Sequence, residues 1–299
     1  MKKTVAMMTA AMMVAGTLAG CGSSNTAPAA TTAATEAASE KETTAAATEA
    51  ASEAGDTGSA AASGDIQTPS GKFTVGFDQE FPPMGFVGDD GQFTGFDLDL
   101  AKEVASRLGL EFVPQPINWD AKDMELDSGN IDCIWNGFTM QGREDAYTWV
   151  GPYMANNQVF VVNADSAIAS KTDLAGKAVE VQKDSSGLAA LQDDADLSAS
   201  FGSLTEVADY NTALMDLESG ACDAVCMDSI VAGYQIKSSG KNMKILDDTL
   251  SAEEYGIGFK KGEDELAKAV HDTLMDMKDD GTVAKISNDW FGSDVFTLK

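Results

Sequence analysis

Apolar and polar positions along the chain predict helices and buried strands in turn. Over residues 119–143 the pattern predicts a helix, a turn at Gly129 that ends it, a buried strand over 131–135 and a polar loop. Asp120 stands where an N-cap is favoured. The loop follows the C-terminal end of the strand, which is where open α/β sheets bind their ligands.

A second stretch, residues 210–228, repeats this pattern 91 positions later. With Trp119 aligned to Tyr210, the identical pairs are Met124 and Met215, Leu126 and Leu217, Ser128 and Ser219, Gly129 and Gly220, and Asp132 and Asp223. The repeat indicates two α/β units whose polar ends face one cleft. The alternative is that any helix–Gly–strand unit carries such a pattern, and five identities are few.

The rest of the chain shows the same alternation from about residue 69. Leu100, Val104 and Leu108 recur at helical spacing, and Gly109 ends that helix. We expect strands over 73–77, 112–117, 158–163, 177–182, 243–246 and 254–259, and the last helices over 263–278 and 284–291. Strands that alternate with helices predict an α/β fold with mainly parallel pairing.

The N-terminus has the pattern of a targeting segment. Two lysines precede an apolar stretch over 5–19 that is short for a membrane span. The following Leu-Ala-Gly-Cys at 18–21 resembles a bacterial lipobox, which implies a signal peptide over 1–20 and lipid on Cys21. The alternative is an ordinary buried cysteine in a signal anchor.

Residues 21–68 contain Ala, Thr, Ser, Glu and Gly with almost no large apolar side chains. Such a composition cannot bury enough surface to offset the entropy lost on ordering. We therefore expect a disordered tether between the lipid and a folded domain.

Charge and composition argue against several classes of function. The formal net charge is −28, and such an acidic surface opposes nucleic acid and anionic lipid alike. His271 is the only histidine in the sequence, which argues against a His-rich metal site and a Ser–His–Asp nucleophile. We expect no nucleic-acid partner, no metal and no cofactor.

Three cysteines besides Cys21 lie in or beside apolar strands: Cys133, Cys222 and Cys226. Cys222 and Cys226 are four residues apart on an extended segment, which is too far for a disulfide. No Cys-x-x-Cys spacing offers zinc ligands. We expect all three to be small buried side chains.

Several motifs occur together in one order over nearly the whole domain. They are FTVGFDQEFPPMGF, GQFTGFDLDLAKEVASRLG, LDSGNIDCIWNGFT with Arg143 and GPY behind it, EVQKDSSG, LESGACDAVCMD, EYGIGFKKG and DWFG. Through these motifs, residues 73–291 resemble the polar amino-acid family (family 3) of extracytoplasmic solute-binding proteins, which serve ABC importers.

The resemblance implies a two-lobed α/β fold of the type II periplasmic-binding-protein kind, with mainly parallel sheets. Two hinge strands join the lobes, which close on ligand. Lobe 1 would comprise residues 69–159 and 255–299, and lobe 2 would comprise 160–254. The hinges would fall near residues 159–161 and near Tyr255.

The resemblance also implies a site for a free amino acid. The family places an arginine at the position of Arg143, whose guanidinium fork suits the ligand carboxylate. Ser185 and Ser186 begin a helix and would add donors. Asp228 suits the ligand ammonium, to which two further residues offer a backbone carbonyl and a hydroxyl, namely Gly137 and Thr139.

The side-chain end of this site is expected to lie between aromatic and acidic groups. Phe81 and Trp119 match aromatic positions that sandwich the ligand in relatives, while Asp78 and Glu80 point at the side-chain end. The expected ligand-binding residues are Asp78, Phe81, Trp119, Gly137, Phe138, Thr139, Arg143, Gln182, Ser185, Ser186 and Asp228. One departure is that Thr139 and Arg143 are four steps apart, where relatives commonly have five.

Each of these assignments has a structural alternative. Arg143 could pair with Glu144 or Asp145, and Asp228 could cap a helix over 229–234. For the remaining residues the alternatives are core packing of Phe81 and Trp119, a turn cap at Asp78 and a solvated charge at Glu80.

The function implied by the resemblance is capture of a free, polar amino acid for an ABC importer. We expect a monomeric lipoprotein on the outer face of the bacterial cell membrane, without catalytic chemistry, that delivers its ligand to a membrane permease with a separate ATPase. The sequence contains no phosphate-binding G-x-x-x-x-G-K-[ST] loop, which agrees with that division. The alternatives are a dehydratase-like enzyme on the same fold and a ligand-sensing domain that feeds a receptor.

Overall fold

A computed structural model describes residue 68 and residues 70–299 of this chain. The expected signal peptide and lipidated Cys21 lie outside the described residues, as does the expected tether except for Thr68. Within the described part, no helix is long and apolar enough to cross a membrane. The same residues place no three His, Cys, Asp or Glu side chains together as a metal site requires.

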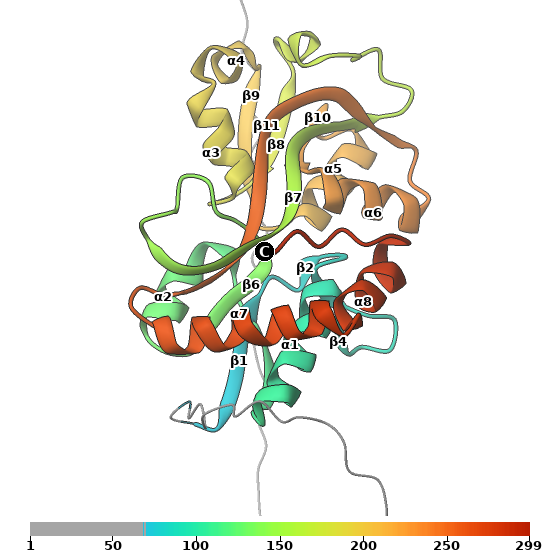
Figure 1. Ribbon diagram of the computed structural model, residues 1–299. Coiled ribbons are helices and arrows are strands. Elements are labelled where there is room, and N and C mark those ends of the chain that lie inside the picture. Colours follow the sequence, from blue (N-terminus) through green and yellow to red (C-terminus); the bar gives the residue numbers. More distant parts are fainter. Residues whose placement is uncertain (1–67, 69) are drawn as a thin grey trace, which may run out of the picture. The chain divides into compact units, whose positions relative to one another are not determined.

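Eight strands form the main sheet in the order β5-β1-β6-β11-β7-β10-β8-β9, and three short strands form a second sheet (Figure 1). The strands of the main sheet are β1 (Lys72–Phe77), β5 (Glu111–Pro116), β6 (Cys133–Thr139), β7 (Tyr147–Asn163), β8 (Ala178–Gln182), β9 (Ser203–Val207), β10 (Ala224–Asp228) and β11 (Met243–Lys260). The small antiparallel sheet contains β2 (Glu80–Phe81), β3 (Gly85–Val87) and β4 (Phe93–Thr94).

Helices cover both faces of the main sheet. They are α1 (Phe96–Leu108), α2 (Lys122–Asp127), α3 (Ser186–Asp193), α4 (Ala195–Ser200), α5 (Tyr210–Ser219), α6 (Ser229–Ser239), α7 (Asp264–Asp279) and α8 (Thr282–Phe291), with 3-10 turns η1 (Trp119–Ala121) and η2 (Lys171–Leu174). In Figure 1, α3 and α4 lie on one side of β8–β10, and α5 and α6 lie on the other.

The main sheet divides into two lobes. We call the part with β5, β1 and β6 the first lobe and the part with β10, β8 and β9 the second lobe. Within each lobe these three strands pair in parallel, as the alternation of strands and helices predicts. Antiparallel pairing enters only through the two long strands, β7 and β11, that run between the lobes.

The strands β7 and β11 are longer than their hydrophobic patterns predict. Only the ends of these strands are apolar enough to be recognised, whereas each runs unbroken through a polar middle. In that middle, Ala252, Glu253 and Glu254 pair with Asn157, Asn156 and Ala155. Each strand thus supplies the hydrogen-bonding partner that makes the other's polar segment a strand, and the two cross together from one lobe to the other (Figure 1).

The internal repeat is present in three dimensions. Gly129 and Gly220 both adopt left-handed φ angles, 75° and 79°, after α2 and α5. The carboxylate of Asp132 accepts from the Thr74 amide at 2.6 Å, and that of Asp223 accepts from Ala178 at 2.9 Å. The paired leucines are buried and the paired methionines exposed, at 64% and 63%. The two repeats therefore hold their strands by the same contacts.

Two smaller sequence expectations have clear outcomes. Cys133, Cys222 and Cys226 are buried free thiols, as predicted. The prediction that Asp120 caps the helix after it was wrong, because a 3-10 turn intervenes and α2 starts after Ala121 with no side-chain cap. Asp120 instead forms an ion pair with Lys183 of the second lobe.

Candidate functional site

A small cavity lies where the two lobes meet. Nine of the eleven sequence-predicted site residues line it: Phe81, Trp119, Gly137, Thr139, Arg143, Gln182, Ser185, Ser186 and Asp228. The other two do not line it: Asp78 accepts a hydrogen bond from Gln182 of the lining, and Phe138 packs against Trp119. The cavity volume is only about 10 Å³, which is room for about one water molecule. Any larger ligand must therefore enter while the lobes are further apart.

Arg143 reaches the cavity from the loop between β6 and β7. Its guanidinium donates to the carbonyl oxygens of Thr139 at 3.1 Å and Asp184 at 3.4 Å and lies 5.0 Å from the Phe138 ring. Within the described residues it forms no ion pair, so the alternative pairing with Glu144 or Asp145 is absent. A guanidinium without an anionic partner can bind a carboxylate by donating two parallel hydrogen bonds to its oxygens.

Asp228 ends β10 and is almost fully buried. Its carboxylate accepts from Asn156 at 2.7 Å, from the Tyr255 hydroxyl at 2.7 Å and from the Tyr210 hydroxyl at 3.3 Å. Burial, followed by the nearby charge of Glu253, raises the pKa of Asp228 to about 8. Although Asp228 precedes α6, its side chain makes no capping hydrogen bond. Its oxygens instead belong to the cavity wall.

The N-terminus of α3 faces the same cavity. The Ser185 hydroxyl caps the helix by accepting from the Leu188 amide at 3.1 Å. The Ser186 hydroxyl accepts from Thr139 of the first lobe at 3.2 Å and from Gln158 at 3.1 Å. This arrangement brings a helix N-terminus, which favours anions, next to a hydroxyl from the opposite lobe.

Of the three predicted aromatic residues, two line the small cavity and one packs behind them. Phe81 lies 5.8 Å from Tyr210 across the lobes, and Trp119 lies 5.5 Å from Phe138 with the rings nearly perpendicular. Phe138 is fully buried and does not reach the cavity. Its position under both Trp119 and Arg143 makes it a support for those two side chains rather than part of the surface.

Gly137 lies at a position that a side chain would obstruct. Its φ angle is 56°, and a Cβ there would come within 3.0 Å of the Tyr255 ring and 3.1 Å of Phe81. Its amide donates to the buried carboxylate of Asp97 at 2.7 Å. Burial is the main cause that raises the pKa of Asp97 to about 7. The Asp97 carboxylate thereby fixes the backbone near the end of β6.

Gln182 and Asp78 connect the two lobes at the other end of the cavity. The Gln182 amide donates to Asp78 at 2.7 Å, and Asp78 also accepts from the Glu80 amide at 2.9 Å, which is the turn-cap contact considered above. Burial raises the pKa of Asp78 to about 6. Glu80 accepts from Asn211 of the second lobe, so it is not merely a solvated charge.

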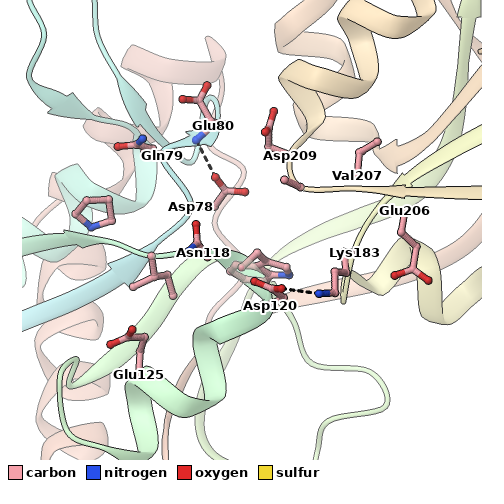
Figure 2. A pocket seen from close by; sticks show the side chains of 14 residues that line it. Asp78, Gln79, Glu80, Asn118, Asp120, Glu125, Lys183, Glu206, Val207 and Asp209 are labelled. Atoms are coloured by element: carbon pink, nitrogen blue, oxygen red, sulfur yellow. Dashed lines mark hydrogen bonds and ion pairs between the residues drawn. The ribbon is translucent and has the colours of Figure 1, made fainter. Parts of the chain in front are cut away.

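Asp78 also borders a larger cavity of about 840 Å³ (Figure 2). Both lobes contribute carboxylates to the lining of this larger cavity. Lys183 also lines it, and its ammonium group forms an ion pair with Asp120 at 2.7 Å. The lining includes Asp78, Glu80, Asp120, Glu125, Glu206 and Asp209. The two cavities share Trp119 in their linings, and Asp78 of the larger cavity accepts from Gln182 of the small one.

Three buried polar residues near the site were not predicted from the sequence. Asn156 and Gln158 of β7 and Glu253 of β11 are 3%, 0% and 5% exposed. They form hydrogen bonds to one another and to residues of the cavity wall. The sequence held one signal for two of them. Asn156 and Gln158 are two residues apart just before the apolar run that ends β7, and residues at that spacing in a strand face the same side.

Comparison with known proteins agrees with this architecture. The family described as bacterial extracellular solute-binding proteins, family 3, matches residues 73–293. The L-cystine-binding protein TcyJ of Escherichia coli is 32% identical over 231 residues, which cover 75% of this chain and 84% of that protein. The L-cystine-binding protein TcyA of Bacillus subtilis is 31% identical over 229 residues, which cover 75% and 83%.

A solved structure extends the likeness to three dimensions. An ABC uptake transporter substrate-binding protein from Streptococcus pneumoniae, with bound histidine, matches with a TM-score of 0.74 and 33% identity. The match covers 77% of this chain and 96% of that one. Two α/β lobes around a shared cavity define a solute-binding protein of the type II kind. The chain belongs to family 3 of the bacterial extracellular solute-binding proteins.

Proposed function

We propose that the protein captures a free amino acid outside the cytoplasm and delivers it to the permease of an ABC importer. The observation that carries this proposal is that Arg143 and Asp228 line one small cavity between the lobes. A cation and a carboxylate in one cavity match the carboxylate and ammonium groups of an α-amino acid. The ligands named for the relatives, cystine and histidine among them, are of this class.

In this proposal each lobe contributes to both ends of the ligand. Arg143 of the first lobe and the N-terminus of α3 in the second bind the carboxylate. Asp228 of the second lobe binds the ammonium, with Thr139 of the first beside it. A ligand that touches both lobes binds the closed form better than the open one, and this differential affinity shifts the equilibrium toward closure.

The lobe boundaries follow the crossing strands. We assign residues 69–159 and 255–299 to the first lobe and 160–254 to the second, with β7 and β11 as the elements that bend. The pairing of the crossing strands supports these boundaries. From Tyr255 onward β11 pairs with β6 of the first lobe, and from Gln158 onward β7 pairs with β10 of the second lobe. Opening would also separate contacts between the lobes outside the small cavity, among them the Asp120–Lys183 ion pair and the hydrogen bond from Asn211 to Glu80.

We further propose that the protein is a monomeric lipoprotein anchored by Cys21 and that it performs no catalysis. A lipid on Cys21, followed by a tether over 21–68, would keep the binding domain near the permease, while a separate ATPase supplies energy. Support for the anchor comes from the lipobox-like residues 18–21 after an apolar stretch.

The test uses ligand derivatives that remove one charge at a time. Once a bound amino acid is found, its N-acetyl form and its carboxamide are titrated against the chain from residue 21 with Cys21→Ser. We expect both derivatives to bind at least about 100-fold more weakly, because each leaves a buried charge without its partner. Equal binding of either derivative would contradict the assigned ends of the site.

A further inference from the structure

The crossing strands place a second carboxylate beside the one assigned to the ligand ammonium. Strand β7 lies between β10 and β11, and its register sets Asp228 opposite Gln158 on one side and Glu253 opposite Asn156 on the other. Asp228 lines the ligand cavity, while Glu253 borders an adjoining cavity of about 430 Å³ that shares Thr139 and Ser186 with it. The two acidic residues are therefore neighbours across one strand, at the point where the lobes are joined.

A single amide holds both carboxylates. The Asn156 Nδ2 donates to Asp228 Oδ1 at 2.7 Å and to Glu253 Oε1 at 2.6 Å. The Gln158 Nε2 donates to the same Glu253 oxygen at 2.9 Å. Because both acidic oxygens bond to one nitrogen, they lie within two hydrogen-bond lengths of each other.

The donors around this pair are neutral. Among the described residues, amides and hydroxyl groups supply the hydrogen bonds to it, and neither Asp228 nor Glu253 forms an ion pair with a lysine, arginine or histidine. Neutral donors satisfy the oxygens but do not cancel two buried negative charges. Two adjacent carboxylates in such surroundings favour the uptake of one proton by the pair.

We propose that Asp228 and Glu253 act as one pair that holds a single proton in the unliganded protein and exchanges it for the ammonium group of the ligand. This inference rests on the proposed amino-acid function and adds Glu253 to the binding site as a positioning residue. The proton passes to solvent and the charged ammonium takes its place, so the two carboxylates and the ammonium together carry the same net charge, −1, as the protonated pair did before binding.

Other titratable groups facing the pair do not supply this exchange. Tyr210 of α5 and Tyr255 of β11 contact Asp228, and burial raises the pKa of each hydroxyl well above its usual value. The Cys226 thiol of β10 is affected in the same way. Arg143 lines the same cavity. On the side of Glu253, Asp193 and Asp194 line the adjoining cavity and are exposed or partly exposed.

The experiment is isothermal titration of the bound amino acid at pH 7.5 in buffers of different ionisation enthalpy, using residues 21–299 with Cys21→Ser. We expect a net release of protons on binding, since burial and the charge of Glu253 raise the pKa of Asp228 and the ammonium favours the ionised pair. Glu253→Gln should release fewer protons and retain one-to-one binding, because the second carboxylate is gone while the burial of Asp228 remains. The matched control is Glu254→Gln, the next residue, which is exposed and should release the same proton as the parent.

Four outcomes separate the possibilities. Equal proton release in the parent and in Glu254→Gln, with less release in Glu253→Gln, supports the inference. Binding without proton release, or unchanged release in Glu253→Gln, overturns it and leaves the proposed function intact. Binding of no amino acid overturns the proposed function as well.

A measurement on the unmutated site keeps the test valid if Glu253→Gln does not fold. The Kd should fall about tenfold from pH 6 to pH 7, because one proton leaves with each ligand that binds. A Kd that stays constant over that range overturns the inference.

Discussion

Lys122 of α2 donates to the carboxylate of Asp184, which lies in the turn just before α3, and this ion pair joins the two lobes beside the ligand cavity. Lys122 is only 2% exposed and also lies 5.2 Å from the Trp119 ring. Asp184 adopts a left-handed φ of 56°, which is uncommon for a residue with a side chain. The contact fixes the turn that presents Ser185 and Ser186, so it favours the closed arrangement.

We expect Lys122→Met to weaken ligand binding about tenfold, which corresponds to about 1.4 kcal/mol. The methionine keeps much of the buried volume but cannot hold Asp184. The matched control is Lys183→Met, which removes the more exposed ion pair with Asp120. Such pairs contribute about 0–1 kcal/mol. Titration calorimetry of both variants checks this, and an equal loss in the two would argue against a special role for Lys122.

Arg143→Ala should weaken binding by about 2–5 kcal/mol, the usual cost of truncating one partner of a buried charge pair. Arg107 offers a comparison, because it pairs with Glu103 and Asp280 on α1 and after α7, outside the cavity lining. Arg107→Ala should change stability slightly and leave the Kd unaltered. Unchanged affinity in Arg143→Ala would remove this residue from the site.

Folding stability should fall as pH rises from about 4 to 8. Burial raises the pKa values of Asp78, Asp97 and Asp228 to about 6, 7 and 8, whereas an unfolded Asp titrates near 4. In that window the folded state binds more protons than the unfolded state. The stabilising contribution is thus complete below about pH 4 and is lost as pH rises through the folded pKa values.

Urea unfolding without ligand at pH 5 and pH 8 measures this dependence. The net charge of −28 changes stability in the same direction through repulsion. Asp97→Asn separates the two effects, since it removes one buried titration and barely changes the repulsion. The variant should lose less stability than the parent between these pH values. Greater stability of the parent at pH 8 would contradict the argument.

Cys21→Ser should move the protein from the membrane fraction to the soluble fraction of the producing cell. The substitution removes the thiol to which lipid would be attached, while the apolar stretch before it is unchanged. Fractionation followed by mass measurement of the protein checks both location and lipid. Retention of the variant in the membrane would indicate an uncleaved anchor instead.

The predictable part of this protein is the part with local signals. The repeat was visible because Gly129 and Gly220 end helices, and Asp132 and Asp223 precede apolar strands in both copies. The candidate lining residues were predicted mainly through the resemblance to the solute-binding family, and the structure brings nine of eleven to one cavity. Their roles toward a ligand remain predictions.

The crossing strands and their buried polar groups were not predictable in this way. Residues 247–253 read as Asp-Asp-Thr-Leu-Ser-Ala-Glu, a pattern typical of an exposed loop. Glu253 is buried only because Asn156 and Gln158, far away in the sequence, pair with it across β7 and β11. A local sequence pattern contains no information about a partner nearly a hundred positions away. The burial of Glu253 therefore depends on long-range strand pairing.

The most direct test of the amino-acid function is a thermal-shift screen of residues 21–299 with Cys21→Ser, after unfolding and dialysis to remove bound ligand. The twenty amino acids, cystine and ornithine are each added at high concentration, and Arg143→Ala is run in parallel. A ligand at 100 times its Kd adds about 2.7 kcal/mol of stability. We predict a clear shift with one or a few α-amino acids that Arg143→Ala loses. No shift with any of them would contradict the proposed function.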